Sequence, residues 1–186
     1  GPVKSYNRCY FWSVWYGAFG PDAFLKLVTE AIPAHAAEAD GTKETLLAMT
    51  DAAGVPLLAQ LEAFAVAALT GRNLSWGPLA GGDAYDWGQG LERWEPAQLG
   101  PGGNASAALA NGGMLARELT GAATVSITAS PDLDLFVVRD GPAGATVTDL
   151  PDSGGPVAAP AAGERVWAVV ARPSPGQTPS ATLRAR

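Results

Sequence analysis

The feature that most constrains the fold is a stretch of alternating side chains that begins near residue 122. Thr124, Ser126 and Thr128 alternate there with apolar Val125 and Ile127. Alternation with a period of two is typical of a β-strand with one buried and one solvated face. This stretch therefore predicts a half-buried strand.

A second strand is predicted directly after the first. Asp132 and Asp134 alternate with leucines, and an apolar run then continues to Val138. Proline cannot donate a hydrogen bond to a neighbouring strand, so Pro131 belongs in a turn or at the first residue of a strand. We therefore expect two strands that are joined at Ser130 and Pro131.

The same pattern extends through the C-terminal half. Candidate strands recur at short, even spacing, and turns rich in glycine and proline separate them, as in β-sandwiches. The expected strands are 104–109, 114–119, 124–129, 133–139, 146–150, 166–171 and 181–186. Six to eight antiparallel strands predict a β-sandwich or jelly-roll-like domain over residues 97–186.

The N-terminal half carries a helical pattern instead. Apolar side chains recur there at three- and four-residue spacing, and glycine and proline punctuate the segments. One stripe is expected to face the core: Phe24, Leu25, Val28 and Ile32. We expect a subdomain of four helices over residues 3–72, or of five if Pro33 interrupts the second. The predicted fold class is thus α+β.

Two aromatic-rich segments allow more than one interpretation. Residues 5–19 form either a core helix or an aromatic platform for a ligand. Trp76, Trp87 and Trp94 lie in a predicted linker, residues 73–96. These tryptophans either pin the linker to the folded parts, because indole rings are costly to leave in water, or form a sugar-binding surface.

Composition excludes several classes of protein. Of the 186 residues, 47% are hydrophobic and 16% charged, which is enough apolar material for a core. The net charge of −6 disfavours nucleic acid as a partner, because phosphate binding needs a basic face. No run of 18 apolar residues is present, so no helix is expected to span a membrane.

The sequence predicts no catalytic, cofactor-binding or zinc-binding residue. It lacks the H-E-x-x-H, G-x-S-x-G, P-loop and G-x-G-x-x-G motifs. His35 is the only histidine, and we interpret it as a solvated side chain rather than a ligand. Cys9 is the only cysteine, and packing among aromatic rings explains it better than reactivity. Asp132 and Asp134 either hold calcium or lie on a solvated strand face.

The C-terminal half resembles the bacterial pre-peptidase C-terminal domain family. The matching segments are 99–109, 114–119, 123–128, the core Asp132-Leu-Asp-Leu-Phe-Val-Val, 165–171 and 180–184. Members of this family are small β-sandwich modules attached to secreted proteases. The resemblance implies an accessory domain without chemistry of its own.

The helical half is similar to the C-terminal helical region of secreted zinc metallopeptidases of the gluzincin kind. The similarity rests on residues 10–27, which begin Tyr10-Phe-Trp-Ser-Val-Trp-Tyr-Gly, and on residues 54–67. This chain departs from that family because the zinc-binding histidines and the catalytic glutamate have no counterpart. No functional residue is carried over, and zinc would belong to an upstream domain.

These observations together predict a non-catalytic C-terminal region of a secreted, bacterial metallopeptidase-like protein. The residues Gly1-Pro2 are typical of what a tag-removing protease leaves, so we interpret the chain as part of something longer. Its expected partner is an upstream or separate peptidase domain. The alternative is a freestanding extracellular module that binds a carbohydrate or a protein.

Overall fold

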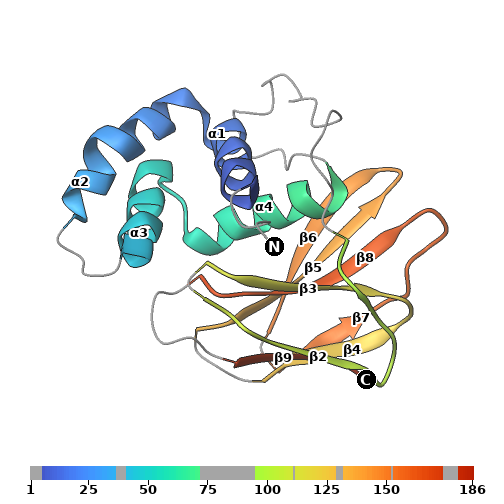
Figure 1. Ribbon diagram of the computed structural model, residues 1–186. Coiled ribbons are helices and arrows are strands. Elements are labelled where there is room, and N and C mark those ends of the chain that lie inside the picture. The colour runs from blue at the N-terminus through green and yellow to red at the C-terminus, as the bar shows by residue number, and fades with distance from the viewer. Residues whose placement is uncertain are drawn as a thin grey trace. The chain divides into compact units, whose positions relative to one another are not determined.

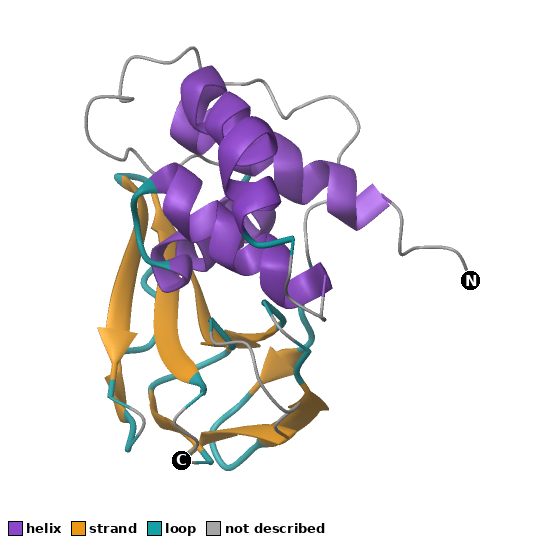
Figure 2. Ribbon diagram, turned by 90° about the vertical axis from the view of Figure 1, so that its left-hand side faces the viewer, coloured by secondary structure: helices purple, strands orange, loops and turns teal. Residues whose placement is uncertain are grey.

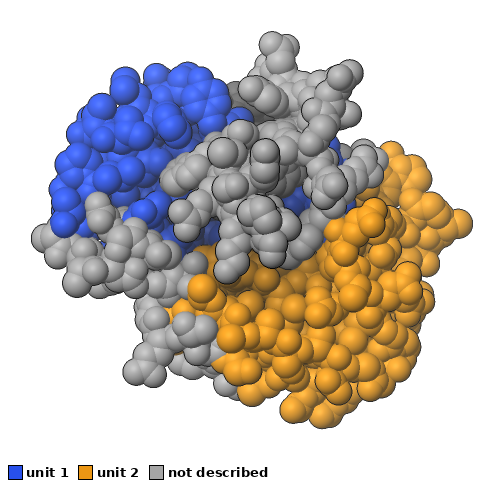
Figure 3. Space-filling view, in the orientation of Figure 1, with its two compact units in different colours: residues 1–93 blue, residues 94–186 orange. Residues whose placement is uncertain are grey.

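The computed structural model describes residues 6–36, 41–71, 95–110, 112–128, 132–151, 153–173 and 180–186, with only the backbone of 6–14, 18 and 41–44. The chain divides into two compact units, residues 1–93 and 94–186 (Figure 3). The described elements of the first unit are helices and those of the second are strands (purple and orange in Figure 2). The predicted α+β class is confirmed.

The helical unit contains four α-helices and one π-helical turn among its described residues (Figure 1). The elements are α1 (Tyr6–Lys26), η1 (Leu27–Ala31), α2 (Ile32–Ala34), α3 (Gly41–Ala53) and α4 (Leu57–Thr70). A kink interrupts α1 at Gly20, which has a φ of 82° and a ψ of 176°. Pro33, which left a fifth helix open, does not separate two helices, because η1 runs directly into α2 with helical backbone at Ala31 and Ile32.

The predicted core stripe of the second helix is also wrong. Leu25 and Val28 are 60% and 44% exposed, whereas Leu27 and Ala31 are buried. The buried Leu27 and Ala31 are four residues apart, as on one face of a helix, so the buried face is rotated away from the predicted stripe. A kink at Gly20 and the π-helical turn η1 interrupt the regular α-helix on either side of Leu25.

Helix α4 is buried around most of its circumference and includes a polar side chain, Gln60, that is only 2% exposed. Gln60 accepts a 2.6 Å hydrogen bond from Trp15 Nε1 and donates one to the Val55 carbonyl oxygen. These bonds tie α1 to α4 and satisfy the buried amide, which would otherwise destabilise the unit.

None of the described helices alone is both long and apolar enough to cross a membrane. The segments Thr45–Ala53 and Leu57–Thr70 meet the length and hydropathy criteria only as a pair, with a bend of 91° between them.

The second unit contains nine described strands in two sheets (Figure 1). One sheet has the order β1-β3-β8-β5-β6 and the other β2-β9-β4-β7. The strands are β1 (Gln98–Leu99), β2 (Asn104–Ala108), β3 (Met114–Leu119), β4 (Ala123–Ile127), β5 (Asp134–Gly141), β6 (Gly144–Leu150), β7 (Gly155–Val157), β8 (Arg165–Ala171) and β9 (Ser180–Ala185).

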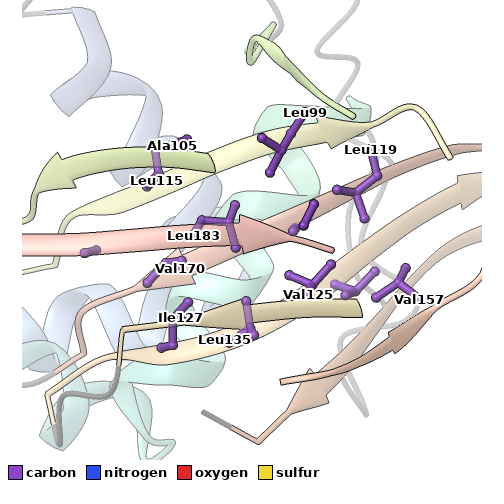
Figure 4. Close-up of a cluster of buried hydrophobic side chains, with 14 of the residues drawn as sticks. Leu99, Ala105, Leu115, Leu119, Val125, Ile127, Leu135, Val157, Val170 and Leu183 are labelled. Atoms are coloured by element: carbon purple, nitrogen blue, oxygen red, sulfur yellow. The ribbon is translucent and has the colours of Figure 1, made fainter. Parts of the chain in front are cut away.

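One apolar cluster holds the two sheets together, which is the arrangement of a β-sandwich. Figure 4 shows its labelled side chains, which come from strands of both sheets. Leu183 on β9 lies opposite Ala105 on β2 and Ile127 on β4, and all three belong to the cluster. Leu135 on β5 and Val170 on β8 contribute from the other sheet.

The predicted strands are present, but the number of strands and the direction of one strand pairing differ from the expectation. The described residues form nine strands instead of six to eight, because β1 and β7 are too short to show periodicity. β1 pairs with β3 in parallel, so the sandwich is not wholly antiparallel. The two strands expected to be joined at Ser130 and Pro131, β4 and β5, belong to different sheets.

The central strands of the five-stranded sheet are apolar on both faces. Leu135 and Val137 belong to the cluster, whereas the alternate residues Phe136 and Val138 do not belong to it and are nevertheless fully buried. Trp167 lies opposite Val138 in the register and is equally buried. Strands buried on both faces lose the alternation that marks a half-buried strand.

Candidate binding surface

Strand β9 lies between β2 and β4, and these three strands place their polar side chains on one face. Successive side chains of a strand point to opposite faces. Because Ala181, Leu183 and Ala185 are buried, the residues that alternate with them along β9 point outward. We call the outward set the hydroxyl–arginine face. It consists of Asn104, Ser106, Thr124, Ser126, Thr128, Thr182, Arg184 and Arg186.

The side chains of this face lie in rows across the strands. Arg184 lies opposite Asn104 on β2 and opposite Ser126 on β4, so these three residues form one row. In the next row Ser106 and Thr182 share a 2.9 Å hydrogen bond between their hydroxyl oxygens. Neighbouring rows on one face are about 6.7 Å apart along a strand, and neighbouring strands about 4.8 Å apart.

A third row continues the sheet beyond β9. The backbones of Arg186 and Thr124 exchange two hydrogen bonds, of 3.0 Å and 2.7 Å, as a directly opposed antiparallel pair does. Arg184 and Arg186 therefore lie two residues apart on the same side of the central strand, and both are exposed. The described residues of the hydroxyl–arginine face include no aspartate, glutamate or aromatic side chain.

A second group of charged side chains lies on the five-stranded sheet. Arg165 on β8 makes two hydrogen bonds to Glu118 on β3, from Nε at 2.8 Å and from Nη2 at 2.9 Å. Its guanidinium also stacks over the buried Trp167 ring, 4.8 Å from the centroid. Bidentate ion pairs are among the strong charged hydrogen-bonded contacts in proteins. This pair connects the end of β3 to the start of β8.

The hydrogen bonds from Arg165 lower the pKa of Glu118 below its ordinary value of 4.5, although burial acts in the opposite direction. The same pair raises the pKa of Arg165. The pKa of Glu164 is lowered too, first by the Ala161 N–H and then by Arg139, whose Nη1 lies 3.0 Å from its carboxylate. The carboxylates of Glu118 and Glu164 are thus both held by arginine side chains.

We expect the Glu118–Arg165 pair to make stability depend on pH. Because the folded pKa of Glu118 is lowered, its contribution is complete above about pH 4.5 and is lost as the pH falls through the folded pKa. Glu118→Gln should remove about 1 kcal/mol near neutral pH, a modest value because the Arg165 side chain is 42% exposed. Urea unfolding of the wild type and the variant at several pH values between acidic and neutral measures this loss in the free energy of unfolding. The loss should become smaller as the pH falls.

The Arg165→Gln background provides the control for this measurement. Glu118→Gln should change neither the stability nor its pH dependence there, because the partner of the carboxylate is already absent. A full effect of Glu118→Gln in that background would assign the stabilisation to another contact.

His35 makes a hydrogen-bond contact with Asp51, whereas the sequence predicted a solvated side chain. Its Nε2 lies 2.7 Å from Asp51 Oδ2, and the histidine side chain is 23% exposed. Lys26 Nζ donates to the Asp51 carbonyl oxygen at 2.8 Å, in the last turn of α3. The two contacts connect the end of α2 and the end of α1 to α3.

Arg172 is a buried cation that sequence reasoning missed. It is fully buried, and its Nη1 donates to the Leu109 carbonyl oxygen at 3.1 Å. Its Nε and Nη2 have no hydrogen-bond partner among the described residues. Nothing in the sequence marks this arginine, because the run before it reads only as a buried strand that ends at Ala171.

The predicted calcium ligands are only partly placed on a strand. Asp134 is the first residue of β5, whereas Asp132 lies in the turn before it, and both side chains have interaction partners. Nowhere in the described part of the chain do three His, Cys, Asp or Glu side chains gather closely enough to hold a metal ion. Trp76, Trp87 and Trp94 lie outside the described residues, and only the backbone of Cys9 is described, within α1.

Comparisons with protein-family models, with curated protein sequences and with solved structures find nothing that matches this chain. The chain's own residues and their geometry are therefore the basis of its proposed function.

Proposed function

We propose that this chain is a non-catalytic part of a secreted metallopeptidase-like protein and that residues 94–186 form its accessory binding module. The observation that carries the proposal is the hydroxyl–arginine face, an exposed polar surface built on the outside of a closed apolar core. The pre-peptidase C-terminal resemblance adds support, because a two-sheet unit fits that kind of module. The proposal includes the jelly-roll-like topology expected from the sequence.

The face is suited to binding rather than to chemistry. Two of its hydroxyl groups share the Ser106–Thr182 hydrogen bond, and the described residues of the second unit include no histidine. A serine or threonine nucleophile needs an adjacent base to lose its proton. Hydroxyl, amide and guanidinium groups in fixed rows supply hydrogen bonds for recognition without that requirement.

The helical unit supports the second half of the proposal, that this chain belongs with a peptidase domain. Tyr16, Leu25 and Val28 are 42%, 60% and 44% exposed, which is unusual for large apolar side chains of neighbouring turns. Tyr16 also stacks edge-on against Phe24 at 5.7 Å, so the exposed side chains adjoin an aromatic pair. Exposed apolar surface of this kind is characteristic of a protein–protein contact, and the proposed occupant is the peptidase domain.

The test measures binding and chemistry on the same preparation of the full chain. Cosedimentation with insoluble polymers, including peptidoglycan, chitin, collagen and calcium alginate, should show saturable binding to at least one. The same preparation should hold no stoichiometric zinc and should not hydrolyse peptides. Stoichiometric zinc together with peptide hydrolysis would contradict the proposal, and so would the absence of binding to every polymer.

A freestanding extracellular module that binds a carbohydrate or protein is the second candidate. The hydroxyl–arginine face favours it equally, because this surface is complete within three strands of the chain. The exposed apolar side chains separate the two candidates. If the chain belongs with a peptidase, adding a purified zinc metallopeptidase domain of the gluzincin kind should protect Leu25 and Val28 from solvent. If the chain is a freestanding module, both side chains should stay exposed.

A further inference from the structure

We infer that the hydroxyl–arginine face binds an acidic polysaccharide, a sugar polymer that carries carboxylate or sulfate groups. This inference rests on the proposed binding function and names the class of ligand for it. The observation behind it is the juxtaposition of Arg184 and Arg186 with hydroxyl and amide side chains on neighbouring strands, without a carboxylate side chain among them.

The charge of this face is opposite to that of the chain. The protein has 18 acidic and 12 basic residues and a net charge of −6. Arg184 and Arg186 nevertheless lie side by side on one strand, about 6.7 Å apart, and both are exposed. Elsewhere in the sandwich Arg139 and Arg165 have carboxylate partners, Glu164 and Glu118. The two arginines of the face are thus available to an external anion, and a guanidinium fits a carboxylate or sulfate with two parallel hydrogen bonds.

The residues around the arginines identify the rest of the ligand. Asn104 and Ser126 flank Arg184 on either side, and Ser106 and Thr182 occupy the next row. Hydroxyl and amide groups both donate and accept hydrogen bonds, as the hydroxyl groups of sugars do. The described residues of the face offer no aromatic ring for a sugar to stack on. Recognition is therefore polar, and the charged groups of the polymer provide most of the affinity.

The geometry favours a polymer over a small molecule. The three rows cross neighbouring strands of one sheet, so their side chains form an extended surface. β9 is paired on both sides, which holds the backbone of Arg184 in place before a ligand arrives. A chain with repeated anionic groups can contact both arginines at once. Duplex DNA presents phosphates but no free hydroxyl groups along its backbone, so the hydroxyl and amide side chains of the face match it less well than they match a sugar polymer.

The experiment is isothermal titration calorimetry of the full chain at low salt against four soluble polymers. Polygalacturonate presents carboxylates, dextran sulfate presents sulfates, dextran is the neutral control and duplex DNA is the polyphosphate control. Binding to polygalacturonate, to dextran sulfate or to both is expected, and the comparison identifies which anionic group is preferred. The affinity should fall with added salt, because the contacts are ionic.

Three variants locate the binding site. Arg184→Gln should weaken binding about tenfold, the equivalent of one charged hydrogen-bonded contact, and Arg184→Gln with Arg186→Gln should remove measurable binding. Lys26→Gln removes the same charge from a helix of the first unit and should leave the affinity unchanged. Because Arg184 and Arg186 are exposed, their variants should keep wild-type strand resonances, which confirms that they are folded.

The outcomes separate this inference from the proposed function. Undiminished binding of an anionic polymer by the double variant, equal affinity for dextran, or tighter binding of DNA would overturn the inference and leave a binding module in place. No binding to any of the four polymers, combined with binding to chitin or collagen in the cosedimentation test, would also overturn the inference alone. No binding in either experiment would overturn both.

Discussion

Gly154→Ala is expected to destabilise the sandwich by about 2–5 kcal/mol. Gly154 has a φ of +91°, in the region that disfavours residues with a Cβ, and this strain costs about 1–2 kcal/mol. A Cβ at this position would also lie 2.7 Å from Ser126 Cβ and would collide with the Val125 carbonyl oxygen. The added overpacking costs about 1–3 kcal/mol, because the neighbours are strand backbone that cannot move aside.

Gly163→Ala is the matched control for this prediction. Gly163 has a similar φ, +77°, but a Cβ there would meet no atom within 4 Å. Its cost should therefore be the backbone strain alone, about 1–2 kcal/mol. Urea unfolding followed by the amide resonances of β4 and β9 measures both variants within the sandwich. Equal losses for the two alanines would show that Gly154 does not approach β4 as closely as described.

The close approach of Gly154 also bears on binding. Ser126 belongs to the hydroxyl–arginine face and lies opposite Arg184, so a displaced β4 would change the row that surrounds the arginine. A glycine in a turn after β6 thus supports a surface on another sheet. The sequence Ser153-Gly-Gly-Pro identified a turn here, but its pattern does not reveal which strand the turn contacts.

Local periodicity predicted the elements of the fold where one face of an element is buried. The alternation at Thr124, Ser126 and Thr128 predicted β4, and residues 114–119 coincide with β3. β1 and β7, of two and three residues, are too short to show a repeated alternation. β4 and β5 lie next to each other in sequence yet in different sheets, because strand order is decided by long-range packing.

Neither the buried face of the second helix nor the meeting of β2, β4 and β9 on one surface could be predicted from the sequence. Leu25 and Val28 have helical spacing, but the buried face of this helix contains Leu27 instead of them, and apolar spacing alone does not distinguish the two faces. The polar side chains of β2, β4 and β9 alternate visibly in the sequence. Their meeting on one face depends on the order β2-β9-β4, which joins segments up to 80 residues apart in pairs such as Asn104 and Arg184. The same holds for His35 and Asp51, which no motif connects.

Leu183→Ala is expected to destabilise the sandwich by about 2–5 kcal/mol, as truncations of fully buried leucines do. Leu183 is fully buried at the centre of β9, between Ala105 on β2 and Ile127 on β4. Because this strand is paired on both sides, its neighbours cannot collapse into the cavity without disturbing the sheet. The same unfolding measurement, followed by the β9 resonances, gives the loss.

Thr182→Val on the opposite face of the same strand is the matched control. It removes the hydroxyl that bonds Ser106 but keeps a β-branched side chain on the surface, so the expected cost is below about 1 kcal/mol. The contrast tests the register of β9, because a shift by one residue would exchange the buried and exposed faces. If Thr182→Val were as costly as Leu183→Ala, then Arg184 would point inward and the acidic polysaccharide could not reach it. If the contrast holds, stability depends on one face of β9 and binding on the other, and each can be changed without the other.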